Sequence, residues 1–325
     1  MMNPWFRGIT PLLLTLSFCL RLSGAETHTF TDTQGREIVA EVLSYDGTLV
    51  KLRRNDGRVF AFEKSLLSPA DQDYLTALQK SLAAKAAGLP ATIDPRVQAG
   101  KNIILDFPEL PKMHDGQTAA CEIHIPKNFN YPKPVPLLVW FGGGSGSHRV
   151  DGAKGLVDFD EFVVVALPYP NGKFPRIAVN DCDIDRHWKF QRTMLEKVIA
   201  LIPNLDRKIR IVGGTSSGAH NTGSGLDQRW SGFTDYFNAF VLHEGGSSPT
   251  NQFQGAKGKL VYVLWGEKST AREWQEWFNP RIERSGAKLT IESLPEAGHG
   301  LTGEGRALIR KWIESVVIPK LQTKA

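Results

Sequence analysis

The pentapeptide Gly-Thr-Ser-Ser-Gly at residues 214–218 constrains the fold more than any other part of the sequence. It fits the pattern Gly-x-Ser-x-Gly and directly follows the apolar run 209–212, which is typical of a β-strand. A turn from a strand into a helix holds such a serine in a strained conformation with its hydroxyl exposed, and the glycines leave room for the turn. The pattern predicts that Ser216 is a nucleophile; the alternative is a Gly/Ser-rich turn without chemistry.

The segment 101–325 alternates apolar runs with stripes of helical period. The runs expected to be strands are 119–125, 136–141, 162–167, 239–242 and 260–265. Several of them are continuously apolar, as in strands of a parallel sheet that is covered on both faces. Strands that alternate with helices at this spacing predict an α/β domain with a doubly wound, mostly parallel sheet.

Short β-type runs fill residues 27–63, broken by Asp46-Gly47 and Asp56-Gly57. Two Asp-Gly turns between such runs predict a small antiparallel meander. Ser68 followed by a proline then predicts the start of a helix. Residues 79–100, rich in Ala and Lys and then in Gly and Pro, are typical of the end of a helix that runs into a linker, so the domain boundary is expected there.

Three motifs give this N-terminal block a resemblance to a known family. They are Phe-Thr-Asp-x-x-Gly at 30–35, the two Asp-Gly pairs within 46–57, and Leu-Ser-x-x-Asp-Gln-x-Tyr at 67–74. The block, residues 26–78, resembles the Sla-homology domain of the first type. That resemblance implies a small SH3-like β-barrel, and we expect it to act as a spacer or to contact a protein or the cell wall.

The first 25 residues have the pattern of a secretory signal: a basic Arg7, an apolar core at 11–20, and small residues up to Ala25. Export to the periplasm or the exterior is therefore expected. The apolar core is too short for a spanning helix, so no membrane span is expected after cleavage. The basic residues behind the formal charge of +5 are dispersed, which argues against a nucleic-acid partner.

Two cysteines remain after cleavage, Cys121 and Cys182, which either pair or stay separate buried thiols. Asp181, Asp183 and Asp185 precede an expected helix, and helix capping explains them without a metal ion. No metal and no cofactor is predicted.

The run Phe-Gly-Gly-Gly-Ser-Gly at 141–146 follows an expected buried strand. Its backbone N–H groups, from Gly143 or Gly144, would form an oxyanion hole together with the N–H of Ser217. The strand with its glycines, the Gly-Thr-Ser-Ser-Gly turn and a late histidine occur in the order of the α/β-hydrolase superfamily. Residues 102–319 resemble that superfamily, most closely its secreted esterases and polyester depolymerases. The histidine that opens the esterase His-Gly-Gly-Gly motif is missing, which leaves the choice between Gly143 and Gly144 open.

His299 lies between the last expected strand and the C-terminal helix, the place of the general base in the α/β-hydrolases that the chain resembles. A serine hydroxyl needs an imidazole to accept its proton and later to return it to the leaving group. His220 and His243 are the alternatives. His220 follows Ser216 by one helical turn and is expected to pack along the helix, whereas His243 ends a strand.

The acid that supports the base is where the sequence departs from the family. The position of the usual aspartate is Ser269. Glu267 is two residues out of register, and Glu244 follows the neighbouring strand, where some lipases place their acid. Glu244 is slightly favoured, because its longer side chain can reach His299 from that strand.

These expectations define a secreted serine hydrolase. Its substrate would be a carboxylic ester, either a small ester or an acyl group linked to a polysaccharide. A peptidase or a lactone hydrolase on the same scaffold stays open. The alternative from another class is an extracellular binding or scaffold protein in which the hydrolase fold is inert.

Overall fold

The computed structural model describes residues 27–172, 184–228, 232–246 and 252–323. The chain divides into two compact units, Met1–Ala91 and Thr92–Ala325. No helix in the described ranges is both long and apolar enough to cross a bilayer.

The first unit is built on a four-stranded antiparallel sheet in the order β1-β2-β3-β4. Its strands are β1 (His28–Thr31), β2 (Glu37–Tyr45), β3 (Leu49–Arg54) and β4 (Val59–Glu63). Gly47 and Gly57 of the Asp-Gly turns have φ of 103° and 83°, a backbone region that glycine enters without strain. The expected meander is therefore present. Strands β1 and β4 are the ends of this order, and the segment after η1 pairs with the β1 edge through the antiparallel bridge of Asp32 with Leu67. The SH3-like barrel stays a prediction.

Helix α1 (Pro69–Ala86) closes one side of this sheet, after a short 3-10 helix η1 (Lys64–Leu66). Its N-cap is Ser68, whose hydroxyl accepts from the N–H of Asp71 at 3.2 Å. The buried carboxylate of Asp71 accepts from the N–H of Thr31 at 2.8 Å and lies 2.7 Å from His28 Nε2, so it ties the helix to β1. The helix continues eight residues into the segment 79–100 that was expected to link the domains.

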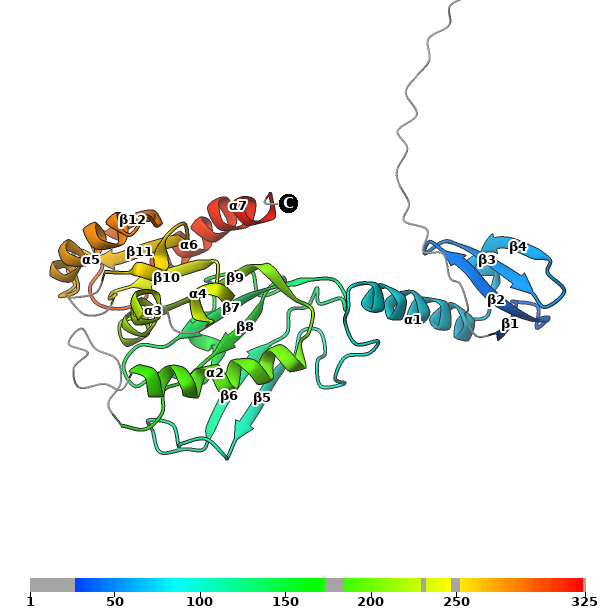
Figure 1. Cartoon of the computed structure of the whole chain (residues 1–325), viewed down its shortest axis with the longest axis horizontal. Helices are drawn as coiled ribbons and strands as arrows, with labels where there is room; N and C mark the ends of the chain where they lie inside the picture. The colour runs from blue at the N-terminus through cyan, green and yellow to red at the C-terminus, as the bar shows by residue number, and fades with distance from the viewer. Residues whose placement is uncertain (1–26, 173–183, 229–231, 247–251, 324–325) are drawn as a thin grey trace, which may run out of the picture. The chain divides into compact units, whose positions relative to one another are not determined.

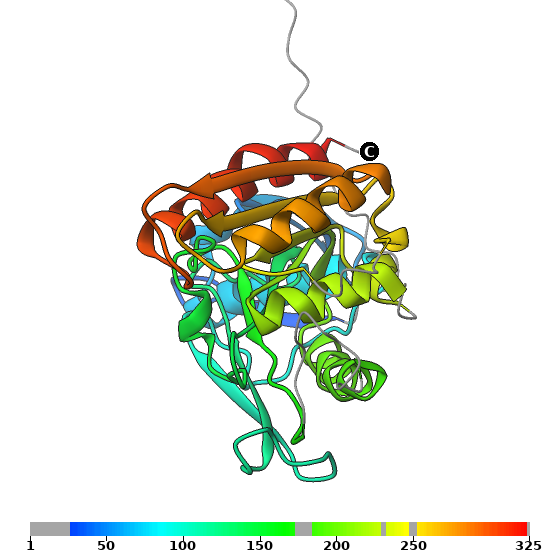
Figure 2. The same ribbon diagram turned by 90° about the vertical axis from the view of Figure 1, so that its left-hand side faces the viewer.

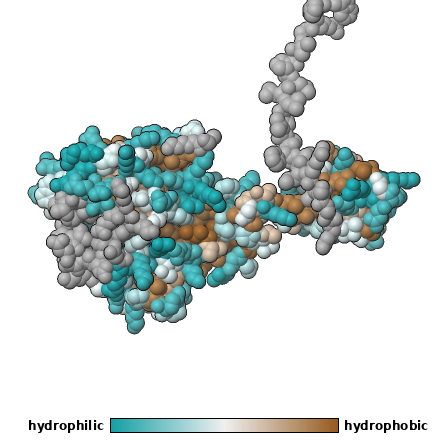
Figure 3. All heavy atoms as spheres, in the orientation of Figure 1, coloured by the Kyte–Doolittle hydropathy of each residue, from teal (hydrophilic) through white to brown (hydrophobic). Residues whose placement is uncertain are grey.

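Figure 3 shows brown areas on the surface of the first unit. This unit exposes several large apolar side chains. They are Val39, Leu49, Val59, Phe60 and Leu66. Three of them, Val39, Phe60 and Leu66, line a groove of about 940 Å³. The expected contact of this unit with a protein or the cell wall stays a prediction.

The second unit contains an eight-stranded sheet in the order β12-β11-β10-β9-β7-β8-β6-β5. The strands are β5 (Asn102–Phe107), β6 (Ala119–His124), β7 (Val135–Phe141), β8 (Val163–Ala166), β9 (Leu205–Thr215), β10 (Ala239–His243), β11 (Leu260–Gly266) and β12 (Lys288–Leu294). Only the pairs β5–β6 and β6–β8 are antiparallel. The predicted α/β fold with a mostly parallel sheet is confirmed.

Helices cover both faces of this sheet (Figures 1 and 2). The α-helices are α2 (Ile184–Leu201), α3 (Ser217–Gln228), α4 (Phe233–Tyr236), α5 (Arg272–Arg284), α6 (Gly303–Trp312) and α7 (Ile318–Gln322). The 3-10 helices η2 (Val150–Ala153) and η4 (Gln254–Ala256) and the π-helix η5 (Ile313–Val317) complete the set described for this unit. One core lies under α2, α3 and α5, and the other under η2, α6 and η5.

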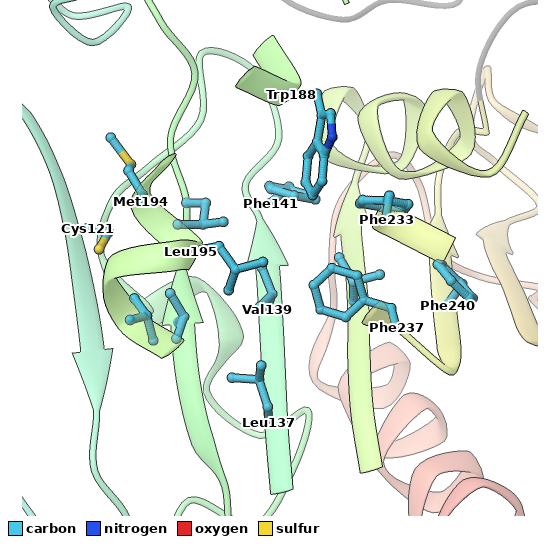
Figure 4. Packing of buried hydrophobic residues seen from close by; sticks show 14 of the residues in the cluster. Cys121, Leu137, Val139, Phe141, Trp188, Met194, Leu195, Phe233, Phe237 and Phe240 are labelled. Carbon is cyan, nitrogen blue, oxygen red and sulfur yellow. The ribbon is translucent and has the colours of Figure 1, made fainter. Parts of the chain in front are cut away.

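The core under α2 and α3 packs against the end of β7 (Figure 4). There Phe141 and Trp188 belong to one cluster of buried side chains, and the ring of Phe233 meets Trp188 edge to face with centroids 4.9 Å apart. The carboxyl ends of the parallel strands β7, β9, β10, β11 and β12 share one edge of the sheet, because parallel strands run in one direction. Ligands of open α/β sheets bind at that edge.

We expect Ile211→Ala to lower the free energy of unfolding of the second unit by about 2–5 kcal/mol, because Ile211 is fully buried on the inner strand β9. The matched control is Ile291→Ala on the edge strand β12, where the side chain is 43% exposed and a loss below about 1 kcal/mol is expected. Urea titration followed by tryptophan fluorescence measures both. Equal losses would contradict the described core.

Candidate active site

Ser216 lies between the last residue of β9 and the first residue of α3. Its φ is 54°, a left-handed conformation that costs a residue with a side chain roughly 1 kcal/mol or more. The surrounding structure holds it there, since the N–H of Ser216 donates to the carbonyl of His243 at 2.8 Å. The strained turn predicted from the sequence is therefore present at this serine.

Both glycines of the turn are required by packing. A Cβ on Gly218 would lie 2.1 Å from the carbonyl oxygen of Phe141, and a Cβ on Gly214 would lie 2.5 Å from the carbonyl carbon of Gly218. Backbone thus meets backbone on both sides of Ser216, at distances that no side chain tolerates. This close approach brings the end of β7 against the start of α3.

The glycine run after β7 passes beside Ser216. A Cβ on Gly143 would lie 3.5 Å from the Cβ of Ser216, so the backbone of Gly143 borders the serine. The N–H of Gly146 donates to the carbonyl of Gly143 at 3.0 Å and closes a turn, in which Gly144 has φ of 59°. Ser217 is the first residue of α3, so its N–H has no acceptor within the helix. Gly143 therefore borders Ser216 and Ser217 directly follows it, as an oxyanion hole requires, while Gly144 is the next residue of the turn. The donor role of each stays a prediction.

Tyr169 supports this run and was not found from the sequence. Its hydroxyl donates to the carbonyl of Gly142 at 2.8 Å, and its ring would lie 2.7 Å from a Cβ on Gly146. Tyr169 is separated from the glycines by more than 20 residues of chain, and no local pattern marks it. Its contact depends on how strands β7 and β8 pair.

His299 follows β12 and precedes α6. Its Nδ1 lies 3.2 Å from Oε2 of Glu244 and 3.3 Å from Oγ of Ser269, while the side chain as a whole is 44% exposed. The loop that carries it is fixed to the end of β11, because the N–H of Lys268 donates to the carbonyl of Ala297 at 3.0 Å.

Glu244 is fully buried and directly follows β10. Its φ of 59° is again left-handed. Oε1 accepts from the N–H of Gly266 at 2.6 Å, and Oε2 accepts from the hydroxyl of Ser269. A buried carboxylate is expensive unless hydrogen bonds replace its water, and here both oxygens receive donors besides His299. The left-handed backbone and the complete set of hydrogen-bond partners are typical of a side chain that is held in place at a functional site.

Glu267, the other candidate acid, lies elsewhere. Its Oε2 is 3.4 Å from Nε of Arg272, at the start of α5. Of the two candidate carboxylates, the structure thus brings Glu244 to His299 and directs Glu267 to an arginine.

The contacts of His299 select one tautomer of the neutral ring. Both neighbours of Nδ1 are oxygens, and a carboxylate oxygen can only accept. The proton of the ring must therefore be on Nδ1, which leaves Nε2 as the basic atom.

His220 and His243 do not fit the role of base. Burial, with a further contribution from nearby His299, lowers the pKa of His220 to about 3, and burial acts in the same way on His243, whose pKa is also about 3. Nδ1 of His220 accepts from the N–H of Gly246 at 3.2 Å, so this ring contacts the segment that follows β10. Both rings stay neutral over the pH range in which a serine hydrolase works.

Two further sequence predictions concern the pairing of Cys121 with Cys182 and the role of the aspartates before α2. Burial raises the pKa of the Cys121 thiol to about 12, which makes it unreactive. Cys182, Asp181 and Asp183 lie outside the described residues, as does the side chain of Asp185. Within the described ranges no group of three or more His, Cys, Asp and Glu side chains is placed to hold a metal ion.

Comparison with known proteins finds similarity in structure alone. No model of a protein family matches the sequence, and no curated protein does. Similar solved structures include a feruloyl esterase module from Clostridium thermocellum complexed with sinapinate, at 13% identity and a TM-score of 0.49, over 67% of this chain and 88% of that one.

Two other similar structures are also esterases. A fungal esterase from Rhizomucor miehei has 16% identity and a TM-score of 0.49, over 77% of this chain and 91% of that one. A hyperthermophilic esterase from Pyrobaculum calidifontis has 12% identity and a TM-score of 0.49, over 77% and 92%. At these values the similarity identifies no substrate for this chain.

We expect Gly218→Ala to lower the free energy of unfolding by about 3 kcal/mol, because the new methyl group would overlap the carbonyl of Phe141. Gly303→Ala is the control, since nothing lies within 4 Å of a Cβ built there. Urea titration of both variants checks this. A Gly218→Ala protein as stable as the control would contradict the close approach of β7 and α3.

Proposed function

We propose that the protein is a serine hydrolase of the α/β-hydrolase type that cleaves carboxylic esters. The observation that carries the proposal is the contact of buried Glu244 with Nδ1 of His299, at the sheet edge where the strained turn presents Ser216. A nucleophile, a base and an acid that orients the base are the three parts that acyl transfer by serine requires.

In the first half of the proposed reaction, Ser216 Oγ attacks the ester carbonyl while Nε2 of His299 accepts the hydroxyl proton. The ring then carries a positive charge, which the carboxylate of Glu244 stabilises through Nδ1–H. The carbonyl oxygen becomes an oxyanion, and the N–H of Ser217 and an N–H of Gly143 or Gly144 would bind it. His299 then gives its proton to the leaving alcohol, and an acyl-serine remains.

In the second half, water takes the place of the alcohol. The water oxygen attacks the acyl-serine while Nε2 of His299 accepts a proton from the water. The same N–H groups bind the second oxyanion. The acid product leaves when Oγ of Ser216 regains the proton from His299. Nε2 of His299 is the atom that carries the proton in each of these transfers.

For the substrate we propose a small ester or an acyl group linked to a polysaccharide. This choice follows the sequence resemblance to secreted esterases and the expected export of the chain. A panel of soluble aryl esters, acylated sugars, lactones and peptide amides distinguishes the classes, and cleavage of amides in preference to esters would contradict the choice.

The competing function is that of an extracellular binding or scaffold protein in which the hydrolase fold is inert. The argument for it is that Ser269 occupies the position of the usual aspartate, so the acid that supports the histidine would be missing. The structure reduces that basis, because a second carboxylate, Glu244, contacts His299.

We expect Ser216→Ala to abolish hydrolysis of a p-nitrophenyl ester, with a loss in kcat of about 10³-fold or more, because the variant lacks the proposed nucleophile. The variant should also fail to react with a fluorophosphonate probe. The matched control is Ser315→Ala, whose hydroxyl bonds the carbonyl of Lys311 in the C-terminal helical segment. Probe labelling that survives in Ser216→Ala would contradict the assignment.

We expect Glu244→Gln to lower kcat by about 10³- to 10⁴-fold, since an amide cannot stabilise the imidazolium and favours the wrong tautomer. Glu267→Gln should change kcat by less than about threefold, because its carboxylate pairs with Arg272 at a partly exposed site. Steady-state kinetics on the same ester decides between them. A large loss in Glu267→Gln with none in Glu244→Gln would reverse the assignment of the acid.

A further inference from the structure

Ser269 lies in the turn between β11 and α5 and is 7% exposed. Its hydroxyl oxygen has three neighbours. It accepts from the N–H of Ala271 at 3.0 Å, it bonds Oε2 of Glu244, and it lies 3.3 Å from Nδ1 of His299. A serine that only filled the space of a missing aspartate would not need this set of contacts.

The direction of each hydrogen bond follows from counting protons. A hydroxyl has one proton, and the carboxylate of Glu244 has none to give. The N–H of Ala271 already uses an acceptor site of Ser269 Oγ, so the hydroxyl proton goes to Glu244. Toward His299 the hydroxyl can then only accept, and Nδ1–H is shared between Ser269 and Glu244.

Glu244 needs such a partner more than an aspartate would. It reaches His299 from the neighbouring strand on a longer side chain with three rotatable bonds, and fixing these costs rotamer entropy. Gly266 N–H fixes Oε1. The second oxygen, the one that meets His299, is fixed by the hydroxyl of Ser269.

We propose that Ser269 is a positioning residue: its hydroxyl turns Oε2 of Glu244 toward Nδ1 of His299, so that a Glu–Ser pair from two adjacent strand ends replaces a single aspartate. This inference rests on the proposed function, because it concerns the same base. Ser269 acts through Glu244 and His299 and does not touch the ester.

The first test compares the parent with Ser269→Ala and Ser269→Thr on a p-nitrophenyl ester. We expect Ser269→Ala to lower kcat by about 10- to 100-fold, as loss of the partner of a functional side chain does, with KM within about twofold. Ser269→Thr keeps a hydroxyl and should recover most of the loss. Unchanged kcat in a folded Ser269→Ala protein would overturn the inference.

The second test exchanges the two roles in the double variant Glu244→Gln with Ser269→Asp. The amide of residue 244 can accept from Gly266 N–H and donate to the new carboxylate, which then faces Nδ1 of His299. We expect the double variant to exceed Glu244→Gln in kcat by at least about tenfold. A double variant with no higher kcat than Glu244→Gln would overturn the proposal that Glu244 and Ser269 together replace one aspartate. If Ser269→Ala does not fold, this second test decides alone.

The two hypotheses fail in different ways. A parent inert to the ester and to the fluorophosphonate probe, or a Glu244→Gln variant as active as the parent, overturns the proposed function and the role of Ser269 with it. An active parent that depends on Glu244 but not on the hydroxyl of Ser269 overturns the role of Ser269 alone.

Discussion

The buried carboxylate of Glu244 is the interaction on which the rest of the site depends. A charge without exposure to water is tolerated only where donors surround it, and the structure provides Gly266 N–H, the Ser269 hydroxyl and His299 Nδ1. These donors come from the end of β11, the turn after it and the loop after β12. One carboxylate therefore connects the ends of β10, β11 and β12, and it fixes the tautomer of the histidine.

The parallel sheet makes this convergence possible. Strands β9, β10, β11 and β12 pair in parallel and in order, so their carboxyl ends bring Ser216, Glu244, Ser269 and His299 to one edge. Two of the residues that directly follow these strands, Ser216 and Glu244, have left-handed backbone. Such strain is kept where the surrounding packing over-determines the conformation, as the Gly218 contact with Phe141 does.

The sequence predicted the parts that depend on local chemistry. Apolar runs located the inner strands, and the Gly-x-Ser-x-Gly pattern located the turn, because both signals are patterns of consecutive residues. The choice between Glu244 and Glu267 depends on the pairing of β10 with β11, in which His243 lies opposite Leu264. That register places Glu244 beside the end of β11, and no local pattern encodes it. The supporting contacts of Tyr169 and Ser269 escaped sequence reasoning for the same reason.

The most direct test of the account is the tautomer of His299. Long-range ¹H–¹⁵N correlation spectra of protein labelled at its 8 histidines report which ring nitrogen carries the proton, and His299→Gln assigns the signal. Because Glu244 and Ser269 are acceptors, we expect the neutral ring to carry its proton on Nδ1, with the signal of that proton shifted far downfield. The downfield shift should be lost in Glu244→Gln. A neutral ring protonated at Nε2 in the parent would contradict the contact from which the proposed chemistry follows.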